Sequence, residues 1–303
     1  MNSAFMTRER CCLCQSDDHS VLGQWSFSEE RVANFLNDYY QDRVPPELLD
    51  DEWLRYVQCS QCGFVWQHRV LDESWLGELY EHWISPQESL AKKELADAKL
   101  YRMYADEMIA ISQIVAKQPS DVAVMDFGMG WGYWARMAQG FGFDVTGCEL
   151  SQRRIDHARE LGIKKVSRLE NCVDHGFDFI NAEQVFEHLV DPYGLLSVLV
   201  EKLSDGGVIR IAVPRSDTAI AKLKAGKWKP NNDSLHPLEH VNAFTSKTLK
   251  RLATSQGLVQ VRRPVSYLRE CRGMGQPYLM RVFFSALGVY DRSGTALYFA
   301  RRC

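Results

Sequence analysis

Three glycines at alternate positions, Gly128, Gly130 and Gly132, mark the stretch of the chain that is richest in chemistry. A short apolar run that ends in Asp126 precedes them and predicts a buried strand, and a helical pattern follows them. Gly128 can take the positive φ of a tight turn, Gly130 lets a ligand lie against the backbone, and Gly132 lets the helix start close to the strand. The order of strand, turn and helix predicts a site for a nucleotide-type ligand, with an empty tight turn as the alternative.

A second predicted strand, 143–148, ends in Glu149, whose carboxylate can accept two hydrogen bonds from ribose hydroxyls. Dinucleotide folds favour the spacing G-x-G-x-x-G, which cradles a pyrophosphate. Here the third glycine comes one position earlier, and Asp126 lies two residues before the first glycine. An acid at that position would repel a pyrophosphate, so the spacing favours a ligand with a cationic amino group.

Two C-x-x-C pairs, Cys11/Cys14 and Cys59/Cys62, have the spacing of metal-binding knuckles. Two such knuckles can close a tetrahedral Zn²⁺ site with no open position, which makes the metal structural. Cys12 is a spare thiol, because its C-x-C spacing with Cys14 makes a poorer knuckle. The alternative is that these are buried cysteines without a metal.

The composition bounds the class of protein. The chain has 303 residues, of which 46% are hydrophobic and 25% charged, with nine cysteines and a formal net charge of −3. A negative net charge does not indicate the basic surface that binds a nucleic-acid backbone. The first ten residues lack the apolar region of a signal peptide, and no run approaches the ~18 apolar residues of a membrane span. We therefore expect a soluble, cytoplasmic protein with no membrane partner, and the composition disfavours a nucleic-acid partner.

The first part of the chain is expected to form a zinc-binding domain, 1–84, with an aromatic-rich insert between the knuckles. A helix that begins near Ser28 and short strands at 54–58 and 64–67 are predicted there. Its tryptophans can form a substrate platform or fill a small core, and we favour the core. A capping box at 85–88 predicts one long linker helix that extends to about residue 117, within a linker segment 85–118.

The remaining segment, 119–303, is expected to be a catalytic domain. Its patterns predict helices at 151–161, 195–203, 245–255 and 276–287 and strands at 163–169, 177–182, 257–268 and 295–301, the last one antiparallel. The run 203–214 predicts a turn followed by a further strand. Lys222, Lys224, Lys227 and Lys229 can contact a phosphorylated substrate, but a solvated helix face is the favoured interpretation.

Three motifs carry a resemblance to a known family. The run D-F-G-M-G-W-G followed by Glu149 resembles motif I of class I S-adenosylmethionine-dependent methyltransferases. The run F-D-F-I-N-A-E-Q-V-F-E-H-L-V-D-P resembles the fourth-strand motif of the small-molecule enzymes, and L-S-D-G-G followed by a strand and Pro214 resembles their fifth strand. With the zinc module and the H-x-x-x-H loop at 236–240, the order of motifs is similar to that of the sugar C-methyltransferases of deoxysugar biosynthesis.

The resemblance implies an α/β fold: a Rossmann-like, seven-stranded methyltransferase sheet with a small N-terminal zinc-binding domain. It implies S-adenosylmethionine as cofactor and a structural Zn²⁺ held by Cys11, Cys14, Cys59 and Cys62. The cofactor-binding residues are then expected to be Asp126, Gly128, Gly130, Gly132, Glu149, Leu150, Glu170 and Gln184. Glu170 departs from the family pattern, because no aspartate follows the third strand.

A carbon or hydroxyl acceptor needs a base. His240 and His236 are the first candidates, because the resemblance places their loop over the substrate, and His188 and Glu187 follow. For each of them, a role in packing and hydrogen bonding within the loop is the alternative.

The sequence thus favours a methyltransferase for a small molecule, such as a sugar nucleotide, with carbon or oxygen as the acceptor. An RNA or protein methyltransferase that docks through its zinc module is the first alternative. The second alternative is a noncatalytic zinc-containing scaffold that kept the fold.

Overall fold

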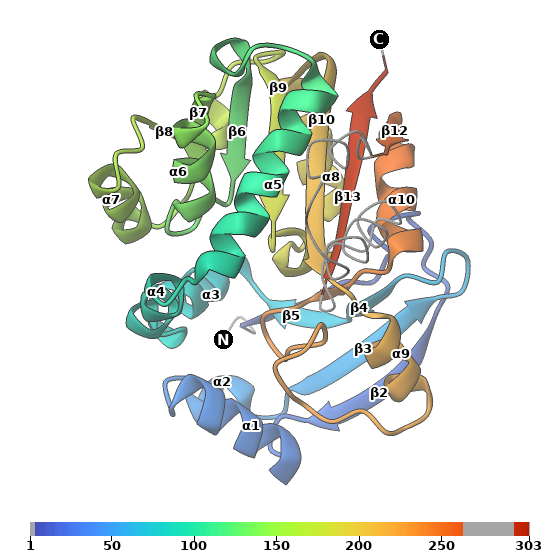
Figure 1. Cartoon of the computed structure of the whole chain (residues 1–303). Coiled ribbons are helices and arrows are strands. Elements are labelled where there is room, and N and C mark those ends of the chain that lie inside the picture. Colours follow the sequence, from blue (N-terminus) through green and yellow to red (C-terminus); the bar gives the residue numbers. More distant parts are fainter. Residues whose placement is uncertain (1–3, 263–293, 303) are drawn as a thin grey trace, which may run out of the picture. The chain divides into compact units, whose positions relative to one another are not determined.

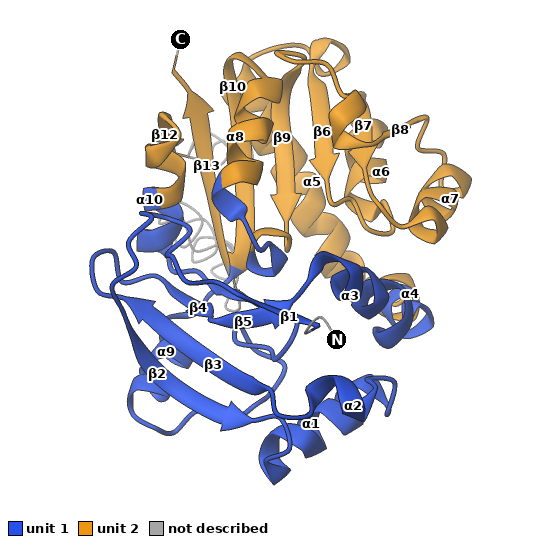
Figure 2. Cartoon of the chain, turned by 180° about the vertical axis from the view of Figure 1, so that it is seen from behind, with its two compact units in different colours: residues 1–90, 187–193, 214–251 blue, residues 91–186, 194–213, 252–303 orange. Residues whose placement is uncertain are grey.

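A computed structural model describes residues 4–262 and 294–302 of the chain. The chain divides into two compact units (Figure 2). Unit 1 comprises Met1–Leu90, Glu187–Tyr193 and Pro214–Arg251, and unit 2 comprises Ala91–Phe186, Gly194–Val213 and Leu252–Cys303. The helix predicted at 276–287 and the strand predicted beyond 262 lie outside the described residues.

Unit 2 is built on a seven-stranded sheet with the order β12-β13-β10-β9-β6-β7-β8 (Figure 1). Strands β6 to β10 pair in parallel, whereas β12 and β13 pair antiparallel. The strands are β6 (Ala123–Phe127), β7 (Asp144–Cys148), β8 (Lys165–Ser167), β9 (Phe177–Glu183), β10 (Leu203–Pro214), β12 (Leu258–Val261) and β13 (Gly294–Arg301). This confirms the predicted Rossmann-like methyltransferase sheet and its antiparallel last strand.

The chain leaves β6 toward β7 and β8 on one side and returns to β9 and β10 on the other. The strand order therefore reverses at β6, and open α/β sheets bind ligands beyond the carboxyl end of the strand at such a point. The three glycines follow the end of β6, which places the glycine turn at this reversal.

Helices cover both faces of the unit 2 sheet, with α5 on one face and α8 on the other (Figures 1 and 2). Apolar residues of α5, α6 and α7 form one buried core with the sheet, to which Met108, Trp134 and Ala158 belong. The helices are α5 (Ala98–Val115), α6 (Tyr133–Gly140), α7 (Gln152–Glu160), α8 (Pro192–Lys202) and α10 (Ser246–Ser255). Short 3-10 turns occur at Pro119–Asp121, Leu169–Asn171 and Phe186–His188.

The single long helix predicted up to residue 117 is wrong, because it is two helices: α4 (Pro86–Glu94) and α5. The side chain of Asp97 accepts hydrogen bonds from the amides of Lys99 and Leu100, each at 3.0 Å, and so caps a new helix. An aspartate inside a helical pattern competes with the backbone in this way. The predicted cap at Ser85 is present, with its hydroxyl accepting from the Glu88 amide at 3.2 Å.

Unit 1 contains a four-stranded antiparallel sheet with the order β11-β4-β3-β2 and a two-stranded ribbon of β1 and β5. Its strands are β1 (Phe5–Thr7), β2 (His19–Ser26), β3 (Trp53–Cys59), β4 (Val65–Gln67), β5 (Arg69–Leu71) and β11 (Asn242–Ala243). Its helices are α1 (Glu30–Tyr40), α2 (Pro46–Leu49), α3 (Glu73–Glu78), a π-helical turn (Leu79–Trp83) and α9 (Asp217–Lys224). The hairpin of β3 and β4 was predicted, whereas β1, β2 and β5 were not.

Aromatic side chains fill the core of unit 1. The ring of Trp228 lies 5.0 Å from that of Trp25 and 5.3 Å from that of Tyr56. This packing favours the core interpretation of the tryptophans. The four lysines of the basic segment are exposed, but only Lys222 and Lys224 lie on α9, whose Ala219 and Leu223 are buried; Lys227 and Lys229 follow the end of the helix.

Within the described residues, no helix has both the length and the hydropathy of a membrane span.

Candidate functional site

The three glycines of the turn in unit 2 share a backbone conformation that favours glycine, but their surroundings differ. Their φ angles are +67° at Gly128, +56° at Gly130 and +81° at Gly132, all in the left-handed region. A Cβ at Gly128 would lie 2.6 Å from Val185, and one at Gly132 would lie 3.0 Å from Ala158. A Cβ at Gly130 would meet nothing within 4 Å. Gly130 is therefore the glycine that borders open space.

The expectation that Gly132 lets its helix start close to the strand needs a correction. The nearest neighbour of its missing side chain is Ala158 of α7, followed by Ile163 beyond the end of that helix. The close approach is thus between the turn and the next helix. A pattern of residues along the chain cannot identify this partner, because it lies 26 positions further on.

The carboxylate of Glu149 is fixed against the glycine turn by backbone amides. One oxygen accepts from the amide of Gly130 at 2.9 Å, and the other accepts from those of Leu150 and Ser151 at 2.8 and 3.1 Å. The guanidinium of Arg154 lies 3.9 Å away. Amide donors stabilise a charged carboxylate and leave its remaining lone pairs for a ligand.

Asp126 carries a buried carboxylate oxygen that no group satisfies within residues 4–262 and 294–302. Oδ1 accepts from the side-chain amide of Asn181 at 2.8 Å. Oδ2 is buried and has no hydrogen-bond partner among the residues that the structure describes. Burial raises the pKa of Asp126 to about 7. A buried acceptor of this kind is costly on its own, so the geometry fits a ligand that brings a cationic donor.

A buried charge network lies behind Asp126. Arg210 donates to the amide oxygen of Asn181 at 2.7 Å, so Asn181 bridges the guanidinium and the aspartate. Arg210 also forms ion pairs with Glu107 of α5 and, at 3.1 Å, with Glu183 of β9. The Arg210 side chain is 2% exposed and that of Glu107 is fully buried. Paired charges at this depth fix the geometry of the groups around them.

The sequence analysis did not identify this network, although a signal for it exists. Arg210 interrupts the apolar strand V-I-R-I-A-V, and Glu107 interrupts the apolar face of its helix. A lone charge in each of two buried elements predicts that the charges pair. Glu107 also accepts from Trp134 at 2.8 Å and from Tyr298 at 3.2 Å.

The remaining predicted cofactor residues follow the carboxyl ends of β7, β8 and β9, which lie on the two sides of β6 in the sheet. Leu150 is 76% exposed beyond β7. Gln184 is exposed beyond β9 with a φ of +55°, and its amide donates to the carbonyl of Ala212 at 2.8 Å. Glu170 is exposed in the 3-10 turn after β8. Positive φ at a non-glycine residue is held only by its surroundings, which is common at ligand sites.

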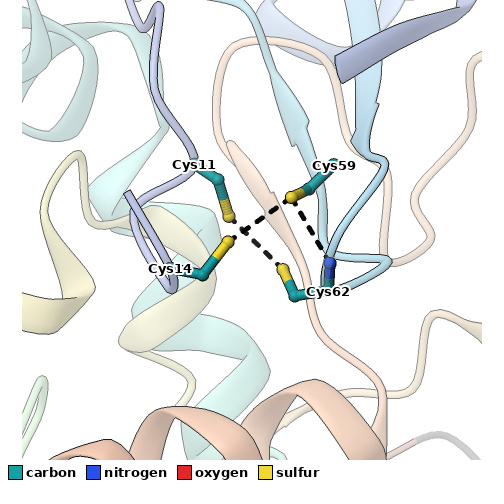
Figure 3. Close-up of side chains that lie close together, drawn as sticks. All are labelled: Cys11, Cys14, Cys59 and Cys62. Atoms are coloured by element: carbon teal, nitrogen blue, oxygen red, sulfur yellow. Dashed lines mark hydrogen bonds between the residues drawn. The ribbon is translucent and has the colours of Figure 1, made fainter. Parts of the chain in front are cut away.

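In unit 1, the four cysteines of the two knuckles converge (Figure 3). The sulfurs of Cys11 and Cys62 are 3.5 Å apart, as are those of Cys14 and Cys59, and all four lie within 4.8 Å of one another. Four thiolates at about 2.3 Å from a central Zn²⁺ would be about 3.8 Å apart. The amide of Cys62 also donates to the sulfur of Cys59 at 3.4 Å. The geometry fits a tetrahedral four-thiolate metal site.

Cys12 stands outside this cluster. Its sulfur accepts a hydrogen bond from the guanidinium of Arg8 at 3.5 Å. Burial raises the pKa of the Cys12 thiol to about 11. The choice of Cys11 over Cys12 as the partner of Cys14 agrees with this geometry.

The three candidate histidines also lie in unit 1. The ring of His240 is 4.9 Å from that of His188 and 5.6 Å from that of His236. Each Nδ1 contacts a backbone carbonyl oxygen: His188 that of Glu239 at 3.0 Å, His236 that of Pro237 at 2.8 Å, and His240 that of Asp233 at 2.8 Å. A carbonyl only accepts, so each Nδ1 carries the proton. Burial lowers the pKa of His236 to about 3 and that of His240 to about 4, so both are neutral at neutral pH.

The structure brings Glu187, His188 and His240 together more closely than His236. One ligand atom from each of the first three lies within 4.8 Å of the other two. His236 is instead surrounded by aromatic rings, with Tyr39 at 4.4 Å. The four candidates for the base are therefore one group of three and a buried neighbour.

The parallel sheet that reverses at β6, with its glycine turn and the acid after β7, defines a class I S-adenosylmethionine-dependent methyltransferase. The chain belongs to the family described as methyltransferase domain, whose model matches residues 98–262, more than half of its length.

Parts of the chain are also similar to a curated protein and to solved structures. The ubiquinone biosynthesis O-methyltransferase of Caulobacter sp. (strain K31) is 28% identical over 123 residues, which cover 35% of this chain and 49% of that protein. The chain therefore spans about half the length of that curated relative. A SAM-dependent methyltransferase from Aquifex aeolicus matches with a TM-score of 0.45 at 15% identity, over 72% of this chain and 98% of its own. The plantazolicin methyltransferase BamL, in complex with a triazolic desmethylPZN analog and SAH, matches with a TM-score of 0.46 at 16% identity, over 76% and 95%.

Proposed function

We propose that this methyltransferase acts on a small molecule and holds S-adenosylmethionine at the glycine turn of unit 2. The observation that carries the proposal is the unsatisfied buried oxygen of Asp126, two residues before the turn. Near it, Gly130 borders open space and anchors the carboxylate of Glu149. An acceptor for a cationic amino group, a passage for the ligand along the backbone and a fixed carboxylate for the ribose hydroxyls are what an amino acid joined to a nucleoside requires.

Each residue then has a defined task toward the cofactor. Asp126 Oδ2 accepts from the amino group, and Glu149 accepts from the ribose hydroxyls. Leu150 offers an exposed apolar surface to the adenine, and Glu170 and Gln184 bind at the ends of the neighbouring strands. When bound, S-adenosylmethionine supplies a methyl carbon activated by a sulfonium. The chain's contribution to the rate is then alignment, since displacement from the sulfonium is in line.

The acceptor must be held and, if it is a hydroxyl or carbon, must lose a proton. We assign this task to His240, His236, His188 and Glu187 of unit 1. With Nδ1 bonded to a carbonyl, a neutral ring presents an unprotonated Nε2, which is the atom that accepts a proton or a hydrogen bond. The carbonyl fixes the tautomer, so the ring does not need to reorient before it acts.

The proposed acceptor class is supported by the resemblance and by the curated relative. The curated relative is named for O-methylation in ubiquinone biosynthesis, which supports a small acceptor. The motif order supports a sugar nucleotide within that class. The net charge of −3 disfavours RNA, and a salt-dependent shift on RNA would revive that alternative.

We also propose a structural Zn²⁺ at Cys11, Cys14, Cys59 and Cys62. The support is the convergence of the four sulfurs from two turns, with no fifth ligand atom in the cluster among the described residues. A site closed by four thiolates stabilises a fold and leaves no position for a substrate.

Isothermal titration with S-adenosylmethionine tests the proposed cofactor site. The full chain should bind the ligand, and Glu149→Ala should weaken binding at least about tenfold, because hydrogen bonds to a charged acceptor contribute about 1.5–3 kcal/mol. Glu160→Ala is the matched control, since Glu160 is an exposed acid on α7. Absence of binding by the unmodified, folded chain would refute the proposal and favour the scaffold alternative.

A further inference from the structure

Three metal-ligating side chains meet in unit 1 and are distinct from the cysteine cluster. Ligand atoms of Glu187, His188 and His240 lie within 4.8 Å of one another, and Nε2 of His188 is 3.8 Å from Oε1 of Glu187. Two imidazoles and one carboxylate are a common donor set for divalent transition metals. We propose that these three residues bind a divalent transition-metal ion.

Both histidines are held in the state that a metal ligand needs. Nδ1 of His188 donates to the carbonyl of Glu239, and Nδ1 of His240 donates to that of Asp233. Metal-binding histidines usually donate their second ring nitrogen to a carbonyl or carboxylate in this way. The hydrogen bond fixes the tautomer, directs Nε2 and raises its basicity toward the ion.

The distances are close to those of a loaded site. Metal–nitrogen and metal–oxygen bonds are about 2.0–2.2 Å long, so neighbouring ligand atoms lie about 3–3.5 Å apart. The 3.8 Å between His188 and Glu187 exceeds this range by about 0.3–0.8 Å, and the 4.8 Å limit exceeds it by about 1.3–1.8 Å. Side-chain rotation covers such a difference. The Glu187 side chain is 1% exposed and that of His188 21%, so the ion has an approach past His188.

Three protein ligands leave coordination positions open, in contrast with the closed four-thiolate cluster. An ion at this site takes an oxygen atom of a bound molecule as a further ligand. With Nε2 of His188 and His240 bound to the ion, these atoms no longer accept a proton. The ion instead lowers the pKa of a coordinated hydroxyl, whose proton passes to solvent water, and the oxygen that remains can accept a methyl group. This catalytic use rests on the proposed function, whereas binding of the metal does not.

Titration of the full chain with Co²⁺ tests the site, with the zinc content measured before and after. We expect one Co²⁺ to bind in addition to the cysteine-bound metal, with the weak visible absorption of nitrogen and oxygen ligands. Thiolate charge-transfer absorption would report cobalt that had entered the cysteine cluster instead. His188→Gln, His240→Asn and Glu187→Gln should each reduce the Co²⁺ affinity by more than about tenfold. Loss of a residue that only hydrogen-bonds to a metal ligand already reduces affinity by about tenfold or more, and loss of a ligand should cost at least as much.

His82→Ala is the matched control, because His82 is an exposed unit 1 histidine near an acid and outside the three. It should bind Co²⁺ like the unmodified chain. Unchanged zinc content in the variants separates loss of the site from loss of the fold. The proposal is overturned if the unmodified chain binds no second metal, or if Co²⁺ binding survives all three substitutions. Failure of S-adenosylmethionine binding with Co²⁺ binding intact would instead refute the proposed function alone.

Discussion

The cysteine cluster of unit 1 and the glycine-turn site of unit 2 are assembled in different ways. The cluster takes its four ligands from two short turns, and each turn supplies a C-x-x-C pair. The glycine-turn site also has two local acids, but burial raises the pKa of Asp126, and Asn181, Arg210 and Glu107 from three other elements form the polar network behind it. A cluster of four ligands can be built from short local segments alone, whereas the electrostatics of a ligand site depend on residues from many parts of its unit.

The largest effect should follow from opening the cysteine cluster. The double change Cys59→Ser and Cys62→Ser should reduce the zinc content from about one ion per chain to near zero and unfold unit 1, because structural Zn²⁺ contributes about 10–16 kcal/mol in small zinc-dependent folds. Metal analysis and thermal melting measure both changes. Cys12→Ser should retain the zinc, since Cys12 lies outside the cluster. Full zinc occupancy in the double variant would show that the four sulfurs do not hold the metal.

Breaking the network behind Asp126 should have the next largest effect. Arg210→Met leaves Glu107 buried without its cation, and removal of one partner of a buried pair costs about 3–5 kcal/mol. Urea unfolding monitored on unit 2 measures this loss. Arg136→Met on α6 is the control, because Arg136 is exposed, and it should change the free energy of unfolding by less than about 0.5 kcal/mol. Equal stability of the two variants would contradict the role of the network.

A smaller effect should appear in the pH dependence of cofactor binding. With a pKa of about 7, Asp126 is largely protonated below neutral pH and then attracts no cation. Affinity for S-adenosylmethionine should rise about fivefold to tenfold from pH ~6 to pH ~7.5 as the carboxyl group ionises. Calorimetry across this range, with Asp126→Asn as the comparison, checks it. A slope that persists unchanged in Asp126→Asn would assign the titration to another group.

The same shift has a consequence for stability. Because burial raises the pKa of Asp126 above its usual value of 3.8, the folded state binds this proton more tightly than the unfolded state. The resulting stabilisation of the folded state by protonated Asp126 is fully present below pH ~4 and is lost as pH rises through about 7. Asp126→Asn should therefore flatten this part of the profile of unfolding free energy against pH.

Features with a local cause were predictable from the sequence. The apolar run before the glycines, the positive φ at Gly128 and the pairing of the cysteine knuckles depend on residues a few positions apart. Glu149 lies against the turn as its position after a parallel strand suggested.

Features that depend on distant partners were not predictable. The break at Asp97 depends on competition between capping and helix propagation, which a periodic pattern does not resolve. Strand β2 alternates weakly because most of its residues are only half-buried, so its pairing with β3 decides its conformation. Segments 187–193 and 214–251 join unit 1 through contacts that no linear division into domains expresses.

A crystal structure with S-adenosylhomocysteine bound tests the central claim most directly. The account predicts ribose hydroxyls on the carboxylate of Glu149, the amino group on Oδ2 of Asp126 and the ligand along the backbone of Gly130. Electron density for the ligand at any other place in the chain, or a ligand at the turn with Glu149 rotated away from it, would contradict the account.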